Sequence, residues 1–205
     1  MFYYGFTFCP NKSNGIYIDL WFNKGDPLRK TKALLLGCES EDYITQLVYY
    51  EDFEEHYREN SMLLQYLRFI QYEGDPDLLC KCLDPSVSSI ATCKRDKREL
   101  IVNPISKKNE VSTLKKLKDM CTRSLSKYKE AYEIDEELLR AKELTYNERN
   151  CIIYRMGEKK VLNEMIELAN EGLTLLSKKY KAGINSLKNK SKYSKYLQDI
   201  IKFLK

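Results

Sequence analysis

Residues 151–165 read CIIYRMGEKKVLNEM, and they form the middle of the longest regular pattern in the chain. Apolar residues there and beyond keep the spacing of one helical face: Ile152, Met156, Leu162, Met165, Ile166, Ala169, Leu173 and Leu176. This spacing predicts a long amphipathic helix that starts near Tyr146, with Thr145 and Glu148 as its capping box. Such a stripe normally packs against a core, so the protein should be built mainly from helices.

Further helices are predicted on both sides of this one. An earlier helix begins at Asn109, and its apolar stripe comprises Val111, Leu114, Leu117, Cys121, Leu125 and Tyr128. A short helix should cover residues 135–140, and residues 185–192 should form a loop. The last helix is expected to dock on the body through Tyr193, Tyr196, Leu197, Ile200, Ile201 and Leu204.

The N-terminal part of the chain is typical of a short β region. The segment IYIDLWF, residues 16–22, alternates apolar and polar positions and predicts a strand. The segment YITQLVYY, residues 43–50, is a second strand candidate. The dipeptide Asn14-Gly15 is a hairpin signal that would join the first strand to the earlier apolar run FYYGFTF, residues 2–8.

Helix-start signals follow this β region. Asp26 and the proline after it predict a helix that ends at Gly37. Ser61 is expected to cap a helix that runs to Tyr72, and residues 74–82 should form a short helix. The predicted fold class is therefore mainly α, with a short β region at the N-terminus.

Composition narrows the class of protein. The 205 residues are 43% apolar and 32% charged, as expected of a folded globular chain. Seven cysteines, an odd number without regular spacing, predict an intracellular location, in the cytoplasm or nucleus. Cys80 and Cys82 lack zinc-site spacing and His56 is the only histidine, so no metal site is predicted. No stretch reaches the roughly 18 apolar residues that span a bilayer, so no membrane partner is expected.

Charge is distributed unevenly along the chain. Residues 178–205 contain nine lysines and one acid, whereas residues 39–59 contain eight acids and one base. The lysine-rich end, interleaved with Tyr180, Tyr193 and Tyr196, leaves open an alternative function as a free-standing module that binds nucleic acid or an acidic protein. A solvated helix face is the commoner explanation of such a charge run.

The residues alone predict no catalytic constellation. A single histidine excludes Ser-His-Asp and Cys-His arrangements, and no glycine-rich phosphate loop is present among eight glycines. The carboxylate pairs Glu54-Glu55 and Glu136-Glu137 lie in charged runs that are typical of solvated surface. These patterns favour a helical binding domain over a complete enzyme.

The order of segments resembles one known family. DPLRKTKALLLG (residues 26–37) is followed by YITQLVYYEDF (43–53), SLSKYKEAYEIDEELL (124–139) and IIYRMGEKKVL (152–162). This order is similar to the C-terminal part of the SET-domain methyltransferases related to the RuBisCO large-subunit lysine methyltransferase. The resemblance implies a helical substrate-binding domain over residues 23–205. Residues 1–22 would then be the C-terminal remnant, or tail, of a SET domain.

The resemblance also implies roles for a few residues. Tyr4, Gly5 and Phe6 are similar to the Tyr-Gly-Phe that closes the family's SET domain, where the two aromatic rings line the lysine channel beside the methyl donor. The family's methyl-transferring tyrosine and its S-adenosylmethionine-binding segments lie upstream of that motif. Residues 1–205 are therefore expected to contain no catalytic residue, to bind no cofactor and to be inactive alone, with S-adenosylmethionine used by the full-length enzyme.

The implied partners are a protein substrate with a target lysine and the SET core of the same enzyme. Because the family's histidine-methylating branch departs from Tyr at the position of Tyr4, this residue favours lysine as the target. The acidic residues Glu51, Asp52, Glu54 and Glu55 are expected to steer a lysine-rich substrate segment. Within the GEKK stretch, Gly157 is expected to permit close helix approach, and Glu158 to pair with a base on an adjacent turn.

Overall fold

The computed structural model describes residues 15–35, 43–49, 57–75, 77–79, 104–140, 143–177 and 194–204. The N-terminal part of the described residues contains the strands β1 (Gly15–Trp21) and β2 (Tyr43–Tyr49) and the helices α1 (Arg29–Leu35) and α2 (Tyr57–Ile70). The C-terminal half contains α4 (Lys107–Leu125), α5 (Tyr132–Arg140), α6 (Tyr146–Ser177) and α8 (Ser194–Leu204). The described chain is mostly helical, as the sequence predicts.

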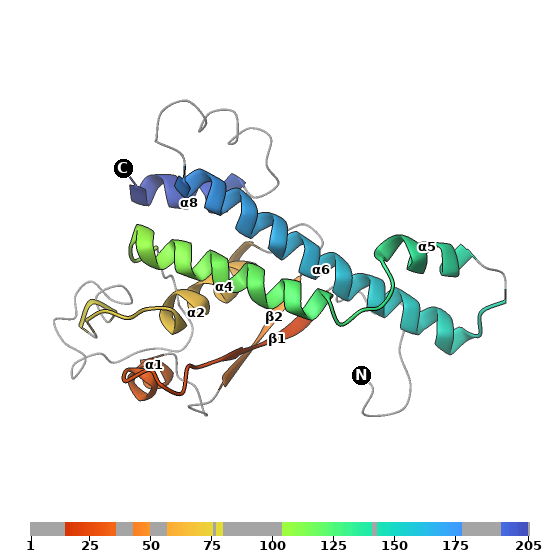
Figure 1. Cartoon of the computed structure of the whole chain (residues 1–205), viewed down its shortest axis with the longest axis horizontal. Helices are drawn as coiled ribbons and strands as arrows, with labels where there is room; N and C mark the ends of the chain where they lie inside the picture. Colours follow the sequence, from red (N-terminus) through yellow and green to blue (C-terminus); the bar gives the residue numbers. More distant parts are fainter. Residues whose placement is uncertain are drawn as a thin grey trace.

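Helices α4 and α6 form the centre of the molecule and lie side by side (Figure 1). Helix α5 packs near the beginning of α6, and α8 packs near its end (Figure 1). Helix α2 contacts α4 and both strands, so it connects the sheet to the helical pair. The long helix predicted from its apolar stripe is therefore the element against which much of the described chain assembles.

Strands β1 and β2 pair in antiparallel register. Ile16 lies opposite Val48, and Leu20 lies opposite Ile44. Both strand predictions are confirmed. The earlier run at residues 2–8, expected to join β1 through a hairpin, lies outside the described residues.

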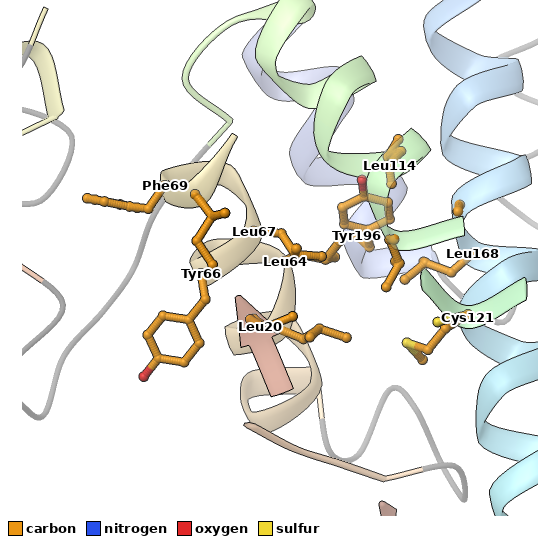
Figure 2. Packing of buried hydrophobic residues seen from close by; sticks show 14 of the residues in the cluster. Leu20, Leu64, Tyr66, Leu67, Phe69, Leu114, Cys121, Leu168 and Tyr196 are labelled. Carbon is orange, nitrogen blue, oxygen red and sulfur yellow. The ribbon is translucent and has the colours of Figure 1, made fainter. Parts of the chain in front are cut away.

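The core lies between the sheet, α2, α4, α6 and α8. Figure 2 shows Leu20 of β1, Leu64 of α2, Leu114 of α4, Leu168 of α6 and Tyr196 of α8 gathered in it. The α6 stripe is confirmed, since five of its members are buried and three half-buried: Ile152, Leu162, Met165, Ala169 and Leu176, then Met156, Ile166 and Leu173. The α8 face is confirmed where its side chains are described, at Tyr196, Leu197, Ile200 and Ile201.

Two of the predicted helix caps are confirmed. Asp26 accepts a hydrogen bond from the backbone N–H of Leu28 at 2.8 Å, and its carbonyl accepts one from Arg29 at 3.1 Å. Thr145 and Glu148 form the reciprocal bonds of a capping box, at 2.8 Å to the Glu148 carboxylate and 3.3 Å to the Thr145 hydroxyl. These caps are local in sequence, so their signals can be recognised without tertiary information.

Three predicted helix starts are corrected. Helix α2 begins at Tyr57, so Ser61 lies inside it and is not its cap, because a helix interior excludes the extended backbone of an N-cap. Helix α5 begins at Tyr132 rather than at residue 135. Helix α4 begins at Lys107 rather than at Asn109. In α4 the first turn buries polar side chains, Asn109 and Glu110, so an apolar stripe alone does not mark where this helix begins.

Ser106 is the N-cap of α4. Its backbone is extended, and its side chain accepts a hydrogen bond from the N–H of Asn109 at 3.0 Å. We expect Ser106→Ala to lower the free energy of unfolding by about 1 kcal/mol, because the first turn loses this acceptor. Ser106→Gly is the matched control and should cost only a few tenths of that value. Urea denaturation followed by circular dichroism measures both, and equal losses in the two variants would contradict the capping role.

Gly172 of α6 lies where two neighbouring helices, α4 and α8, come close to the α6 backbone. A Cβ atom added there would lie 2.8 Å from Cδ1 of Leu114 and 3.3 Å from Cε1 of Tyr196. Glycine therefore allows α4 and α8 to pack tightly on α6. The sequence analysis assigned this role to Gly157, which is half-buried, and did not single out Gly172.

Candidate functional site

A groove of about 830 Å³ lies between β1, α4 and α6. Strand β1, helix α6 and helix α4 with the turn that follows it each supply part of its lining: Ile18, Asp19, Trp21, Lys116, Met120, Cys121, Arg123, Ser124, Lys127, Tyr128, Glu158 and Leu162. The lining mixes apolar side chains with charged groups of both signs. Such a mixture is typical of a surface that orients a partner through a few polar groups.

An exposed aromatic pair marks the β1 side of the groove. Trp21, the single tryptophan of the chain, is 60% exposed, and its ring lies 4.9 Å from that of Tyr43, with 36° between the ring planes. Trp21 and Tyr43 are paired across the two strands in register. A large aromatic ring left in water at a groove is a common anchor for binding, because its burial removes much apolar area from water.

Helix α4 and the following turn give the groove a basic wall. Lys116, Arg123 and Lys127 line it, and Arg123 donates to Asp119 at 2.5 Å in an exposed pair. Within the described part of the chain, no carboxylate partner is found for Lys116 or Lys127. Two ammonium groups at this wall therefore have no carboxylate ion pair with any residue that the structure describes.

Tyr128 and Glu158 connect the basic wall to α6. The Tyr128 hydroxyl donates a hydrogen bond to the Glu158 carboxylate at 2.6 Å. Burial, followed by the bond to Glu158 and its charge, raises the pKa of Tyr128 well above its usual value, so this hydroxyl stays protonated. The prediction that Glu158 pairs with a base on an adjacent turn is corrected to this bond, because the return of the chain after α4 brings Tyr128 over α6.

Lys159, the basic residue that follows Glu158 in the sequence, is buried and does not line the groove. Lys159 is 1% exposed, and its Nζ donates to Asp135 Oδ2 at 2.6 Å and to the Glu130 carbonyl at 2.7 Å. The same ammonium lies 5.3 Å from the centroid of the Tyr128 ring. Lys159 therefore fixes the segment between α4 and α5 onto α6, and with it the position of Tyr128.

Asp135 is the centre of this buried cluster. Its carboxylate accepts hydrogen bonds from Lys159 and from two nitrogens of Arg155, one of them Nε at 3.1 Å. Burial tends to raise the pKa of Asp135, but the hydrogen bonds and charges of Arg155 and Lys159 outweigh it, and the pKa is lowered. This cluster was not predicted from the sequence. Its only local signal is the four-residue spacing of Arg155 and Lys159 on one face of α6.

No chemistry of catalysis is visible in the groove. Cys121 lies in its wall, but burial raises the pKa of this thiol to about 12, so it is neutral and a poor nucleophile. Among the described residues, no group of three or more His, Cys, Asp or Glu side chains is placed to hold a metal ion. The groove presents an exposed aromatic ring and charged walls, which suit contact with a partner.

The site residues named from the sequence are not among those that line the groove in the described part of the chain. Tyr4, Gly5 and Phe6, and the acidic set Glu51, Asp52, Glu54 and Glu55, are outside the described residues, so their roles stay predictions. In the nucleic-acid alternative, the part given to Tyr196 is wrong: this ring is 1% exposed, and its hydroxyl donates to Glu110 at 2.8 Å. A buried ring cannot stack on a base. The helices in the described ranges include none long and apolar enough to cross a bilayer.

Comparison with known proteins supplies an independent observation. The family described as Rubisco LSMT substrate-binding matches residues 23–162. A solved structure of Rubisco LSMT bound to AdoMet is 19% identical over 93% of this chain and 43% of that chain, with a TM-score of 0.58. A structure of the SET domain of LSMT bound to lysine and AdoHcy is 19% identical over 85% of this chain and 36% of that chain, with a TM-score of 0.59.

These similarities show the fold of the chain and the share of each solved protein that it covers. The chain spans less than half the length of the solved proteins that it matches. No curated protein matches the sequence. The matched residues include Lys159 and the first half of α6.

Proposed function

Since the chain belongs to the Rubisco LSMT substrate-binding family, we propose that it is the substrate-recognition domain of an S-adenosylmethionine-dependent protein-lysine methyltransferase. The observation that carries this proposal is the family match over residues 23–162, which includes all of α4 and α5 and half of α6. The groove beside Trp21 supports it, because it offers a protein partner an aromatic anchor and charged walls.

Methyl transfer is assigned to a SET core outside these 205 residues. The solved relatives are described as bound to AdoMet, to lysine or to methyllysine, and this chain covers at most 43% of any of the four. In this proposal residues 1–22 close the SET domain, with Tyr4, Gly5 and Phe6 beside the lysine channel, and residues 23–205 select the protein to be methylated. S-adenosylmethionine and a target lysine then belong to the joined site.

Transfer of labelled methyl groups tests this function. We expect the gene product that contains residues 1–205 together with its SET core to methylate lysine in a protein substrate. Residues 1–205 alone should transfer nothing and should give no heat of S-adenosylmethionine binding in calorimetry. Methyl transfer by residues 1–205 alone, or its absence from the complete gene product, would contradict the proposal.

Variants separate recognition from chemistry in the same assay. Trp21→Ala should lower methylation of the protein substrate about tenfold, because an aromatic anchor is lost, while methylation of free lysine should be unchanged.

Reversing the charges of Glu51, Asp52, Glu54 and Glu55 should slow protein methylation at low salt and have less effect at high salt. An equal loss on free lysine in either variant would indicate a damaged core rather than lost recognition.

A further inference from the structure

We propose that the groove between β1, α4 and α6 holds an acidic segment of the protein substrate, with carboxylates seated on Lys116, Arg123 and Lys127. This inference rests on the proposed function and names the substrate class of the same domain. The partner is thus a protein in which Asp or Glu residues lie within an extended segment. The target lysine itself belongs to the SET core and is separate from this contact.

The basic residues of the groove wall are spaced along one side of the groove. Lys116 and Arg123 are seven residues apart on α4, which places them on one face, about 10 Å apart along the helix axis. Lys127 follows four residues after Arg123 and lines the same groove. A peptide in the extended polyproline II conformation advances about 3.1 Å per residue with three residues per turn, so carboxylates three residues apart lie on one side and about 9 Å apart, close to the separation of Lys116 and Arg123.

Few carboxylates compensate the charges of these basic residues in the described part of the chain. Among the described residues Lys116 and Lys127 have no carboxylate partner, and Arg123 has only the exposed Asp119. A carboxylate arriving at this wall therefore forms ion pairs without displacing a buried partner. Lys115, for which no carboxylate partner is found among the described residues, lies on the same helix next to Lys116 and adds to the positive field there.

The mixed charge of the groove favours a protein partner over a nucleic acid. Asp19 and Glu158 also line the groove, so its charged residues sum to only about one positive charge. A phosphate backbone carries a charge at every nucleotide and would meet both carboxylates. A peptide can place its acids at the α4 wall and apolar side chains against Trp21, Ile18 and Met120, which the lining also provides.

The single tryptophan makes a direct binding test possible. Trp21 lines the groove and is the only tryptophan in the chain, so its emission reports on occupancy without a label. Residues 1–205 are titrated with three ten-residue peptides that differ only in having Glu, Gln or Lys at every third position. We expect a saturable change in emission with the Glu peptide, at least tenfold tighter binding than with the Gln peptide, and weakening with added salt.

Charge-reversal variants locate the contact. Lys116→Glu and Lys127→Glu should each weaken binding of the Glu peptide about tenfold. Lys107→Glu is the matched control: it makes the same charge change on an exposed residue of α4, about 14 Å from Lys116 along the axis, and it does not line the groove. Binding by Lys107→Glu should stay within about twofold of the wild-type value. Equal weakening in all three variants would overturn the proposed site.

Other outcomes also overturn the proposal. Tighter binding of the Lys peptide would assign the groove to a basic segment through Asp19 and Glu158. Tighter binding of a ten-nucleotide RNA than of the Glu peptide would assign it to nucleic acid, and no saturable change with any probe would remove the groove as a binding site. The methylation assay fails or succeeds independently of these titrations, so loss of the groove and loss of the proposed function are distinguishable.

Discussion

Replacing Arg68 with Met is expected to lower the free energy of unfolding by about 3–5 kcal/mol, because the buried Glu110 carboxylate then loses its cationic partner. Arg68 of α2 donates two hydrogen bonds to the Glu110 carboxylate of α4, at 2.7 and 2.8 Å. Both side chains are buried, and the Tyr196 hydroxyl of α8 donates to the same carboxylate at 2.8 Å. One carboxylate thus joins three helices.

Chemical denaturation followed by circular dichroism measures this loss. The matched control is Arg123→Met, which breaks an exposed ion pair on α4 and should change stability by less than about 1 kcal/mol. The double variant Arg68→Met with Glu110→Leu should recover much of the lost stability, because no charge is left buried. A loss in Arg68→Met no larger than in Arg123→Met would show that Glu110 does not depend on this partner.

Replacing Asp135 with Asn is expected to cost about 3 kcal/mol at neutral pH, because buried Lys159 and half-buried Arg155 both lose their anion. The effect should depend on pH. The pKa of Asp135 is lowered in the folded protein, so its stabilising contribution is fully present above its unfolded-state pKa of about 4 and is lost as pH falls through the lower folded-state value. In acid, the protonated Asp135 and the Asn are both neutral.

Urea denaturation from pH 7 to pH 2.5 tests this dependence. The stability difference between the wild-type chain and Asp135→Asn should be large at pH 7 and should shrink as the acid limit is approached. Glu136→Gln is the control on the same helix, since Glu136 lies 4.0 Å from Arg140 in an exposed pair, and it should have little effect at either pH. A difference that stays constant across this range would contradict the assigned role of Asp135.

The fold followed from patterns that repeat locally. The stripes of α4 and α6, the alternation of β1 and the capping box at Thr145 each involve residues a few positions apart, and all are confirmed. Helix starts were less accurate: α4 begins two residues before Asn109, and Ser61 resembles a cap although it lies inside α2. The domain division at residue 22 and the roles of Tyr4 and Phe6 remain predictions.

The candidate site was only partly foreseeable. In the alternation of residues 16–22, Trp21 falls on the same face as Asp19, and the structure shows both side chains exposed. The groove itself needed the structure, because its lining comes from β1, α4 and α6, which are separated by long stretches of chain. Only the apolar stripe of α4 was named from the sequence, and nothing in the order of the basic residues indicates that Lys116 and Lys127 border a hollow.

The amino-acid sequence alone was sufficient for the helical class, the principal stripes and the family, since all three depend on residue order and on the fixed repeat of helix and strand. Tertiary structure was needed to show which charges are buried. Arg68 meets Glu110 across 42 positions, and Tyr196 meets the same carboxylate across 86. Lys159 is indistinguishable in sequence from its exposed neighbour Lys160, yet it faces α5 and lies in the interior. The stretch CIIYRMGEKKVLNEM therefore specifies a helix, whereas packing against residues distant in sequence determines which of its side chains stabilise the protein and which are available to a partner.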